Sequence, residues 1–100
     1  MSEPTPLQLR ILQAVDELDK GEVVSFADIA ARAGNPRAAR AVGKTLSTGG
    51  DVYPWWRVVY SDGHLPPCNP GLQADRLADE KVEIKGFRVV GSPKGRFAKS

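Results

Sequence analysis

The sequence is poor in the features that mark secreted and membrane proteins. Its 100 residues include one cysteine, Cys68, so the chain cannot form a disulfide within itself. No apolar run approaches the roughly 20 residues that a membrane span requires. The start, Met1-Ser2-Glu3-Pro4, lacks the basic and apolar segments of a signal peptide. These absences exclude the disulfide-stapled and transmembrane classes, and we expect a cytoplasmic protein that does not bind membranes.

The sequence also lacks the usual signatures of a catalytic or metal centre. It contains no metal-ligand spacing of Cys and His, no phosphate-binding glycine loop and no pair of carboxylates placed for acid–base catalysis. Asp16-Glu17 and Asp79-Glu80 have the character of solvated helix faces. The sequence therefore predicts neither a metal nor a cofactor.

What the chain does contain is typical of one small globular domain. Apolar residues make up 41% and charged residues 26%, and no repeat divides residues 1–100. No dimerisation element is evident, so we expect a monomer. The net charge is only +2, yet the first 19 residues are acidic while residues 32–57 and 85–99 are basic. Such segregation suits a polyanion such as nucleic acid, or else forms an ordinary solvated surface.

Two helices are predicted at the start of the chain. Apolar side chains recur at helical spacing over Pro6–Leu18, which predicts an amphipathic helix. Ser25-Phe26-Ala27-Asp28 matches a capping box, in which a hydroxyl caps the helix and an acid follows three residues later. A short helix should therefore run from Phe26 to about Ala33, where Gly34 stops it.

A third helix carries most of the positive charge. Asn35 is a good N-cap and Pro36 suits the first helical position, so the helix should run to about Ser47, before a break at Gly49-Gly50. It combines a basic face with small residues: Arg37, Arg40 and Lys44, and Ala38, Ala39, Ala41 and Gly43. This pair of short helices is typical of a helix-turn-helix, whose second helix enters a groove of DNA. A helical corner with a solvated basic face is the alternative.

The second half of the chain alternates short strands with one further helix. We expect a strand at 57–60, a proline-rich loop at 64–71, a helix at 72–81 and a final strand or hairpin at 82–90. Residues 91–100 have the composition of a flexible basic tail. The predicted fold is a mostly α, small winged-helix or helix-turn-helix DNA-binding domain with a short β component.

Two stretches carry a family resemblance. Residues 23–47, VVSFADIAARAGNPRAARAVGKTLS, and residues 53–63, YPWWRVVYSDG, resemble the C-terminal DNA-binding domain of the O6-alkylguanine-DNA alkyltransferases. In that family the motif Pro-Cys-His-Arg-Val contains the Cys that takes the alkyl group and the His that activates it. Here the same frame places Trp55 at the Cys and Trp56 at the His. A Trp at the Cys position is typical of alkyltransferase-like proteins, and the resemblance covers about Pro6–Val90.

The resemblance implies recognition of DNA damage without chemistry. An indole cannot replace the thiolate that removes an alkyl group from guanine, so Trp55 argues against an enzyme. The expected function is to bind O6-alkylguanine in duplex DNA by minor-groove docking and to flip the base into a pocket without alkyl transfer. A handover to nucleotide excision repair is implied in the same way.

The resemblance also assigns DNA contacts. Arg40 would enter the duplex in place of the flipped base, or else contact a phosphate. Phe26 stands where the family has a tyrosine that helps to rotate the target phosphate, or is simply core. Ser25 would cap its helix and could donate to a phosphate, while Arg37 and Lys44 would bind the backbone. The whole predicted DNA-binding set is Ser25, Phe26, Asn35, Arg37, Arg40, Ala41, Gly43 and Lys44.

The expected pocket for the alkylated base centres on the double tryptophan. Trp55 would form a flat apolar wall against the alkyl group, Trp56 would pack beneath it, and Arg57 would brace the site through carbonyls or a carboxylate. The predicted pocket residues are Tyr53, Pro54, Trp55, Arg57 and Val58. Alkyltransferase-like proteins often carry an arginine in the next loop, whereas no arginine occurs here between residues 60 and 72.

Two other functions fit parts of the sequence. The first is a sequence-specific winged-helix transcription factor, although such factors commonly pair half-sites as dimers. The second is an alkyl-transferring enzyme that uses Cys68, although the motif places no histidine to activate that thiol. His64 is near Cys68 in sequence, but it fits a solvated loop equally well.

Overall fold

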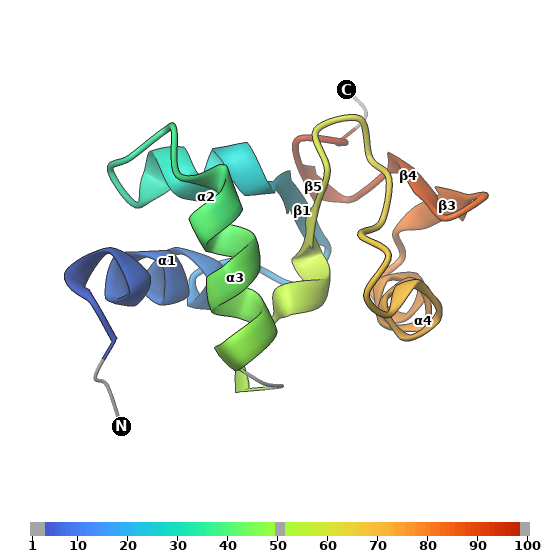
Figure 1. Cartoon of the computed structure of the whole chain (residues 1–100). Coiled ribbons are helices and arrows are strands. Elements are labelled where there is room, and N and C mark those ends of the chain that lie inside the picture. Colours follow the sequence, from blue (N-terminus) through green and yellow to red (C-terminus); the bar gives the residue numbers. More distant parts are fainter. Residues whose placement is uncertain (1–3, 50–51, 99–100) are drawn as a thin grey trace.

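The structure is a computed structural model that describes residues 4–49 and 52–98. Its elements in chain order are α1 (Pro6–Asp16), β1 (Glu22–Ser25), α2 (Phe26–Arg32), α3 (Ala39–Gly49), the 3-10 turn η2 (Trp55–Arg57), β2 (Val58–Val59), α4 (Pro70–Asp79), β3 (Glu83–Lys85), β4 (Arg88–Gly91) and β5 (Lys94–Gly95). Figure 1 shows α1, α2 and α3 gathered on one side of β1, with α4 and the β3–β4 hairpin on the other. The mostly α fold with a short β component is confirmed.

The first helix begins with a capping box from Thr5 to Gln8, which matches the sequence pattern but was not among the predictions. The hydroxyl of Thr5 accepts the backbone N–H of Gln8 at 3.1 Å, and the Gln8 side chain accepts the N–H of Thr5 at 2.8 Å. The apolar stripe packs Ile11 and Val15 into the interior, where both are fully buried. α1 ends two residues before the predicted Leu18, although Leu18 is itself buried.

The second helix starts as its capping box predicts. The Ser25 hydroxyl accepts the N–H of Asp28 at 3.0 Å, and the Asp28 carboxylate accepts the N–H of Ser25 at 2.9 Å. The helix ends at Arg32, and Gly34 then takes a φ of +88°, which favours glycine. The prediction for this helix is confirmed within one residue.

The third helix begins later than predicted. Asn35 does not cap it, because the Asn35 carboxamide oxygen accepts the N–H of Arg37 at 3.3 Å and its carbonyl accepts the N–H of Ala38 at 3.0 Å. These bonds close a separate turn, as asparagine often does, and the helix starts only at Ala39. It extends to Gly49, while Gly50 of the predicted break lies outside the described residues.

Two hydrophobic cores lie on opposite sides of the central strands. In β1, Val24 belongs to the core of α1, α2 and α3, while its neighbour Val23 belongs to the core beneath α4. In β2, Val58 and Val59 divide in the same way, as the two-residue period of a strand requires. Since both strands are buried on both faces, they fix the helix-turn-helix against the second half of the chain. Among the described residues, no helix is both long and apolar enough to cross a membrane.

The predicted flexible tail is in part a strand. β5 pairs in parallel with β1, with Glu22 opposite Lys94 and Val23 opposite Gly95, so the order of this sheet is β2-β1-β5. At Gly95 a Cβ would lie 2.4 Å from the carbonyl oxygen of Val23, and φ is +88°, so the strand needs glycine there. The prediction of a flexible segment is therefore wrong for Lys94–Gly95, and residues 99–100 lie outside the described residues.

Candidate nucleic-acid interface

The double tryptophan forms a single 3-10 turn between the helix-turn-helix and β2. The N–H of Trp55 bonds to the carbonyl of Tyr53 at 2.8 Å, and the N–H of Arg57 bonds to the carbonyl of Pro54 at 3.1 Å. The two indole rings meet edge to face, with centroids 6.1 Å apart and planes at 85°. The turn therefore sends successive side chains in different directions, and each meets a different part of the fold.

Trp56 and Arg57 turn away from the helix-turn-helix and share one carboxylate. The indole Nε1 of Trp56 donates to Glu80 at 2.9 Å, and the Arg57 guanidinium donates to both Glu80 oxygens, the shortest distance being 2.8 Å. Arg57 also donates to the carbonyl of Leu18 at 2.8 Å. Arg57 thus contacts both a carboxylate and a backbone carbonyl, as its expected bracing role requires. Trp56 packs against the core beneath α4, as expected.

Glu80 is the residue that holds this network together. Its side chain is 7% exposed, and it also accepts the backbone N–H of Gly21 at 2.9 Å. Burial works against ionisation, but hydrogen bonds from Arg57, Gly21 and Trp56 outweigh it and hold the pKa of Glu80 below its ordinary value. The expectation that Asp79-Glu80 forms a solvated face is wrong for Glu80, because its partners come from distant parts of the chain.

Arg76 on α4 fills the corner between the two perpendicular indoles. Its guanidinium carbon lies 4.8 Å from the Trp56 ring centroid and 5.8 Å from that of Trp55. Both distances are within the range of a cation–π interaction. The sequence pattern did not single out Arg76, because the contact joins residues twenty or more positions apart.

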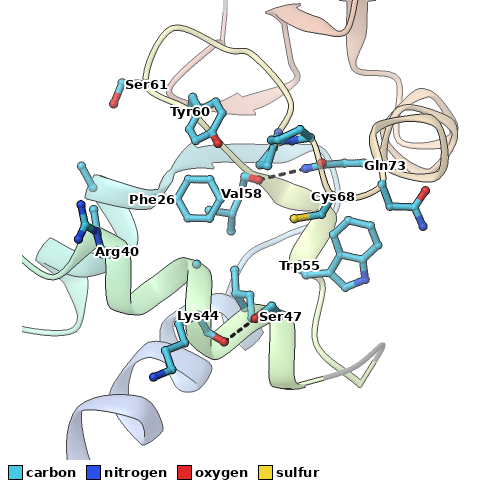
Figure 2. A pocket seen from close by; sticks show the side chains of 17 residues that line it. Phe26, Arg40, Lys44, Ser47, Trp55, Val58, Tyr60, Ser61, Cys68 and Gln73 are labelled. Carbon is cyan, nitrogen blue, oxygen red and sulfur yellow. Dashed lines mark hydrogen bonds between the residues drawn. The ribbon is translucent and has the colours of Figure 1, made fainter.

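A cavity of about 970 Å³ opens on the other side of Trp55. It lies between the helix-turn-helix and the loop before α4, and Figure 2 shows Trp55 and Cys68 on one side with Arg40 across from them on α3. The residues that line it are Phe26, Ala27, Ala39, Arg40, Gly43, Lys44, Leu46, Ser47, Trp55, Val58, Tyr60, Ser61, Pro66, Pro67, Cys68, Asn69 and Gln73. The walls are thus largely apolar, with two cations from α3 at one side.

Four of the predicted DNA contacts line this cavity, namely Phe26, Arg40, Gly43 and Lys44. The other four lie elsewhere. Asn35 and Arg37 are exposed in the turn before α3, and Ala41 packs against the core of α1, α2 and α3. Ser25 is fully buried and its hydroxyl already caps α2, so it cannot reach a phosphate and that part of the prediction is wrong.

The predicted base pocket is brought together only in part. Trp55 and Val58 line the cavity. Tyr53 packs against the core of α1, α2 and α3, Pro54 precedes the 3-10 turn, and Arg57 points to Glu80. Among the described residues, these last three are not part of the cavity wall. The reason is the tight turn, which separates side chains that are adjacent in sequence.

The loop before α4 and the first turn of α4 contribute wall residues that the motif did not identify. Tyr60 packs on Phe26, with ring centroids 5.7 Å apart, and Gln73 holds the bend by donating to the carbonyls of Trp56 and Val58 at 3.1 and 3.0 Å. Cys68 is exposed on the same wall. His64 is not a wall residue in the described part of the chain, and its Nδ1 lies 2.8 Å from an Asp62 carboxylate oxygen.

A helix-turn-helix with cations beside an apolar cavity defines a nucleic-acid-binding domain with room for an extruded base. Comparison with known families agrees with this class. Residues 6–82 match the family described as "6-O-methylguanine DNA methyltransferase, DNA binding domain", and the chain belongs to this family.

Several relatives share most of this chain. It is 41% identical to the "DNA base-flipping protein" of Escherichia coli over 85 residues, which cover 83% of this chain and 64% of that protein. It is 50% identical over 86 residues to the constitutive methylated-DNA–protein-cysteine methyltransferase of Bacillus subtilis, covering 83% of this chain and 46% of that one. The chain thus spans less than two thirds of either relative.

One solved structure is similar over nearly its whole length. It is that of S. pombe Atl1 in complex with damaged DNA containing O6-carboxymethylguanine, with a TM-score of 0.73 and 31% identity. The match covers 85% of this chain and 83% of Atl1.

Proposed function

We propose that this protein recognises alkylated DNA without repairing it, by binding O6-alkylguanine in a duplex and holding the flipped base in the cavity. The observation that carries the proposal is the place of Trp55, whose indole walls a large apolar cavity across from Arg40 and Lys44 of α3. Guanine O6 is hidden in the stacked duplex, so a protein that reads it must extrude the base. The base-flipping name of the E. coli relative and the damaged-DNA complex of Atl1 support the proposal.

The side chains of α3 suit the extrusion step. Arg40 is exposed on the cavity rim, and the residues beside it on this helix are small, so the backbone can approach the duplex closely. A long cation can fill the space that the base vacates while it stays near the phosphates. Lys44, one turn further along the same helix, adds a backbone contact that is independent of sequence.

The absence of alkyl transfer is part of the proposal. Trp55 offers no thiolate at the position where the resemblance places the nucleophile. Cys68 is the second candidate, because it is exposed on the same cavity wall. His64 is not among the described residues that line the cavity, so its imidazole does not share the wall that carries Cys68. A labelled methyl group on guanine should therefore stay on the DNA, and its appearance on the protein would establish an enzyme instead.

The proposal includes the fate of the bound lesion. A protein that shields a lesion without removing it must leave the repair to other proteins, and the family resemblance points to nucleotide excision repair. We expect this protein to act as a monomer, because the sequence shows no evident dimerisation element.

The first test is a binding comparison by fluorescence anisotropy at physiological salt. We would measure one duplex with O6-methylguanine and the same duplex with guanine, for the wild type and for Arg40→Ala. The matched control is Lys94→Ala, which removes a cation from β5, where Lys94 pairs with Asp19. We expect the wild type to prefer the lesion by about tenfold or more, which is about 1.4 kcal/mol. Arg40→Ala should lose most of that preference and Lys94→Ala should keep it.

Equal binding of the two duplexes would refute damage recognition. If affinity then varied with base sequence, the transcription-factor alternative would stand instead.

A further inference from the structure

One face of α4 and its C-terminal end carries three polar side chains that all reach the double-tryptophan bend. Gln73, Arg76 and Glu80 are spaced three and four residues apart, so they lie on the same side of the helix. The buried Leu77 lies among them and anchors this face to the core beneath α4. α4 is therefore a fixed platform behind the bend.

Each of the three side chains holds a different part of the bend. Gln73 donates to the carbonyls of Trp56 and Val58, and Glu80 accepts the indole N–H of Trp56. These hydrogen bonds hold the backbone of the bend and the second indole. Arg76 covers the ring of Trp55, at 5.8 Å from its centroid, while it also covers Trp56 at 4.8 Å.

Trp55 and Trp56 differ in what surrounds their rings. The Trp56 ring packs against the core beneath α4, and its indole N–H donates a hydrogen bond to Glu80. Trp55 belongs to neither hydrophobic core cluster of the described residues, and it lines the open cavity. Arg76 is not among the described cavity-lining residues, so it touches Trp55 away from the place where a base would stack.

We propose that Arg76 is a positioning residue for lesion recognition: its guanidinium, held in the corner between the two indoles, fixes Trp55 as a rigid wall of the cavity. A pre-set wall binds a flipped base without first losing the rotamer freedom of a loose indole. The contribution of Arg76 therefore appears in the affinity for damaged DNA and not in backbone binding. This inference rests on the proposed function and adds a determinant outside the cavity.

The perpendicular arrangement also explains the second tryptophan. A guanidinium binds best over the face of an aromatic ring, and two rings at 85° offer it two faces at one corner. Trp56 thus helps to fix the position of the Arg76 guanidinium, and the guanidinium in turn restricts the ring of Trp55. Replacing Trp56 with a residue that has no aromatic ring should weaken the wall although Trp56 does not line the cavity, whereas phenylalanine keeps a ring face for Arg76.

The test compares Arg76→Ala, Arg76→Met and Arg76→Lys in the same two-duplex binding assay. We expect Arg76→Ala to weaken binding of the O6-methylguanine duplex by about tenfold, as the cost of ordering a loosened indole on binding implies. Binding of the guanine duplex should change by less than about twofold. Arg76→Met keeps an unbranched side chain without charge and should behave like Arg76→Ala, whereas Arg76→Lys should recover part of the preference. Equal losses on both duplexes would overturn the proposal, because they would mark Arg76 as an ordinary phosphate contact.

Tryptophan fluorescence gives a readout that does not depend on DNA. In a Trp56→Phe background, which leaves Trp55 as the one tryptophan of the chain, Arg76→Ala should increase acrylamide quenching and lower the emission anisotropy. Arg76→Lys should restore both values in part. Unchanged quenching and anisotropy would overturn the positioning role even if the wild type prefers damaged DNA. If the wild type shows no preference for the lesion, the proposed function fails, while the fluorescence still tests the support of Trp55.

Discussion

Glu80 and Arg57 form a nearly buried ion pair directly behind the cavity wall. The Arg57 Nη2 lies 2.8 Å from a Glu80 carboxylate oxygen, and the two side chains are 7% exposed for Glu80 and 13% exposed for Arg57. Both groups use their remaining hydrogen-bonding capacity, Arg57 on the Leu18 carbonyl and Glu80 on Trp56 and Gly21. This ion pair connects the residues before β1, the double-tryptophan bend and the end of α4. The cavity wall is therefore attached to the rest of the fold through a charged pair.

Removing the charge of Glu80 should destabilise the fold. Glu80→Gln leaves Arg57 charged, mostly buried and without its carboxylate, and we expect a loss of about 3 kcal/mol in the free energy of unfolding. Urea denaturation followed by tryptophan fluorescence measures it. Asp79→Asn is the matched control, because the neighbouring carboxylate that it removes is exposed, and it should change stability by less than about 0.5 kcal/mol. Equal effects of the two variants would show that the ion pair is energetically neutral.

Acid should weaken the stabilising effect of the Glu80–Arg57 ion pair. The pKa of Glu80 is lower in the folded protein than its ordinary value of 4.5. Its contribution to stability is therefore complete above about pH 4.5 and is lost as the pH falls through the folded pKa. The stability difference between the wild type and Glu80→Gln should be constant near neutrality and should shrink in acid. Other carboxylates, such as Asp62, titrate in both proteins and cancel in the difference. A gap that stays constant down to about pH 3 would contradict the direction of the shift.

Lys44 should act on all DNA alike. It is an exposed cation on the cavity rim of α3, one turn beyond Arg40. Lys44→Ala should weaken binding of damaged and undamaged duplexes by the same factor, and the slope of log affinity against log salt should fall by about 0.9, the value for one phosphate contact. The measurement is anisotropy at several salt concentrations. A selective loss on the lesion duplex would place Lys44 in base recognition instead.

Introducing a cysteine at position 55 alone should not produce alkyl transfer. In Trp55→Cys the new thiol has an indole as its neighbour, and an indole cannot take a proton from it. In Trp55→Cys combined with Trp56→His, the imidazole would stand beside Glu80, which now accepts the Trp56 N–H. We expect transfer of a labelled methyl group from DNA only to the double variant. Transfer to the single variant would mean that another group activates position 55.

The sequence predicted the helices best where a local signal starts or stops them. Ser25 and Asp28 are three residues apart and form a capping box, so the start of α2 could be predicted from these four residues alone. Asn35 and Pro36 carry an equally good local signal, yet the chain uses Asn35 to close a turn and α3 starts at Ala39. Local rules allowed both outcomes, and packing of the two helices selected one.

The site was predictable in its centre and not in its surroundings. Trp55 was identified because the family resemblance aligns it with the family's nucleophile, and it does line the cavity. Ser25 was misplaced because a serine in a capping box can be exposed or buried. Arg76 and Glu80 were missed because nothing near them in sequence marks them; both act on residues that lie twenty or more positions earlier.

The sequence by itself determined most of the helical segments and the basic face of α3, since periodicity, capping and side-chain charge are local properties, and its family resemblance drew attention to Trp55. Only the tertiary structure decided that Val23 and Val24 serve different cores, that Lys94–Gly95 joins the sheet of β1, and that the side chains from Gln73 to Glu80 hold the bend. These features depend on contacts between segments far apart in the chain. The reason is that burial, charge pairing and strand pairing are properties of neighbours in space.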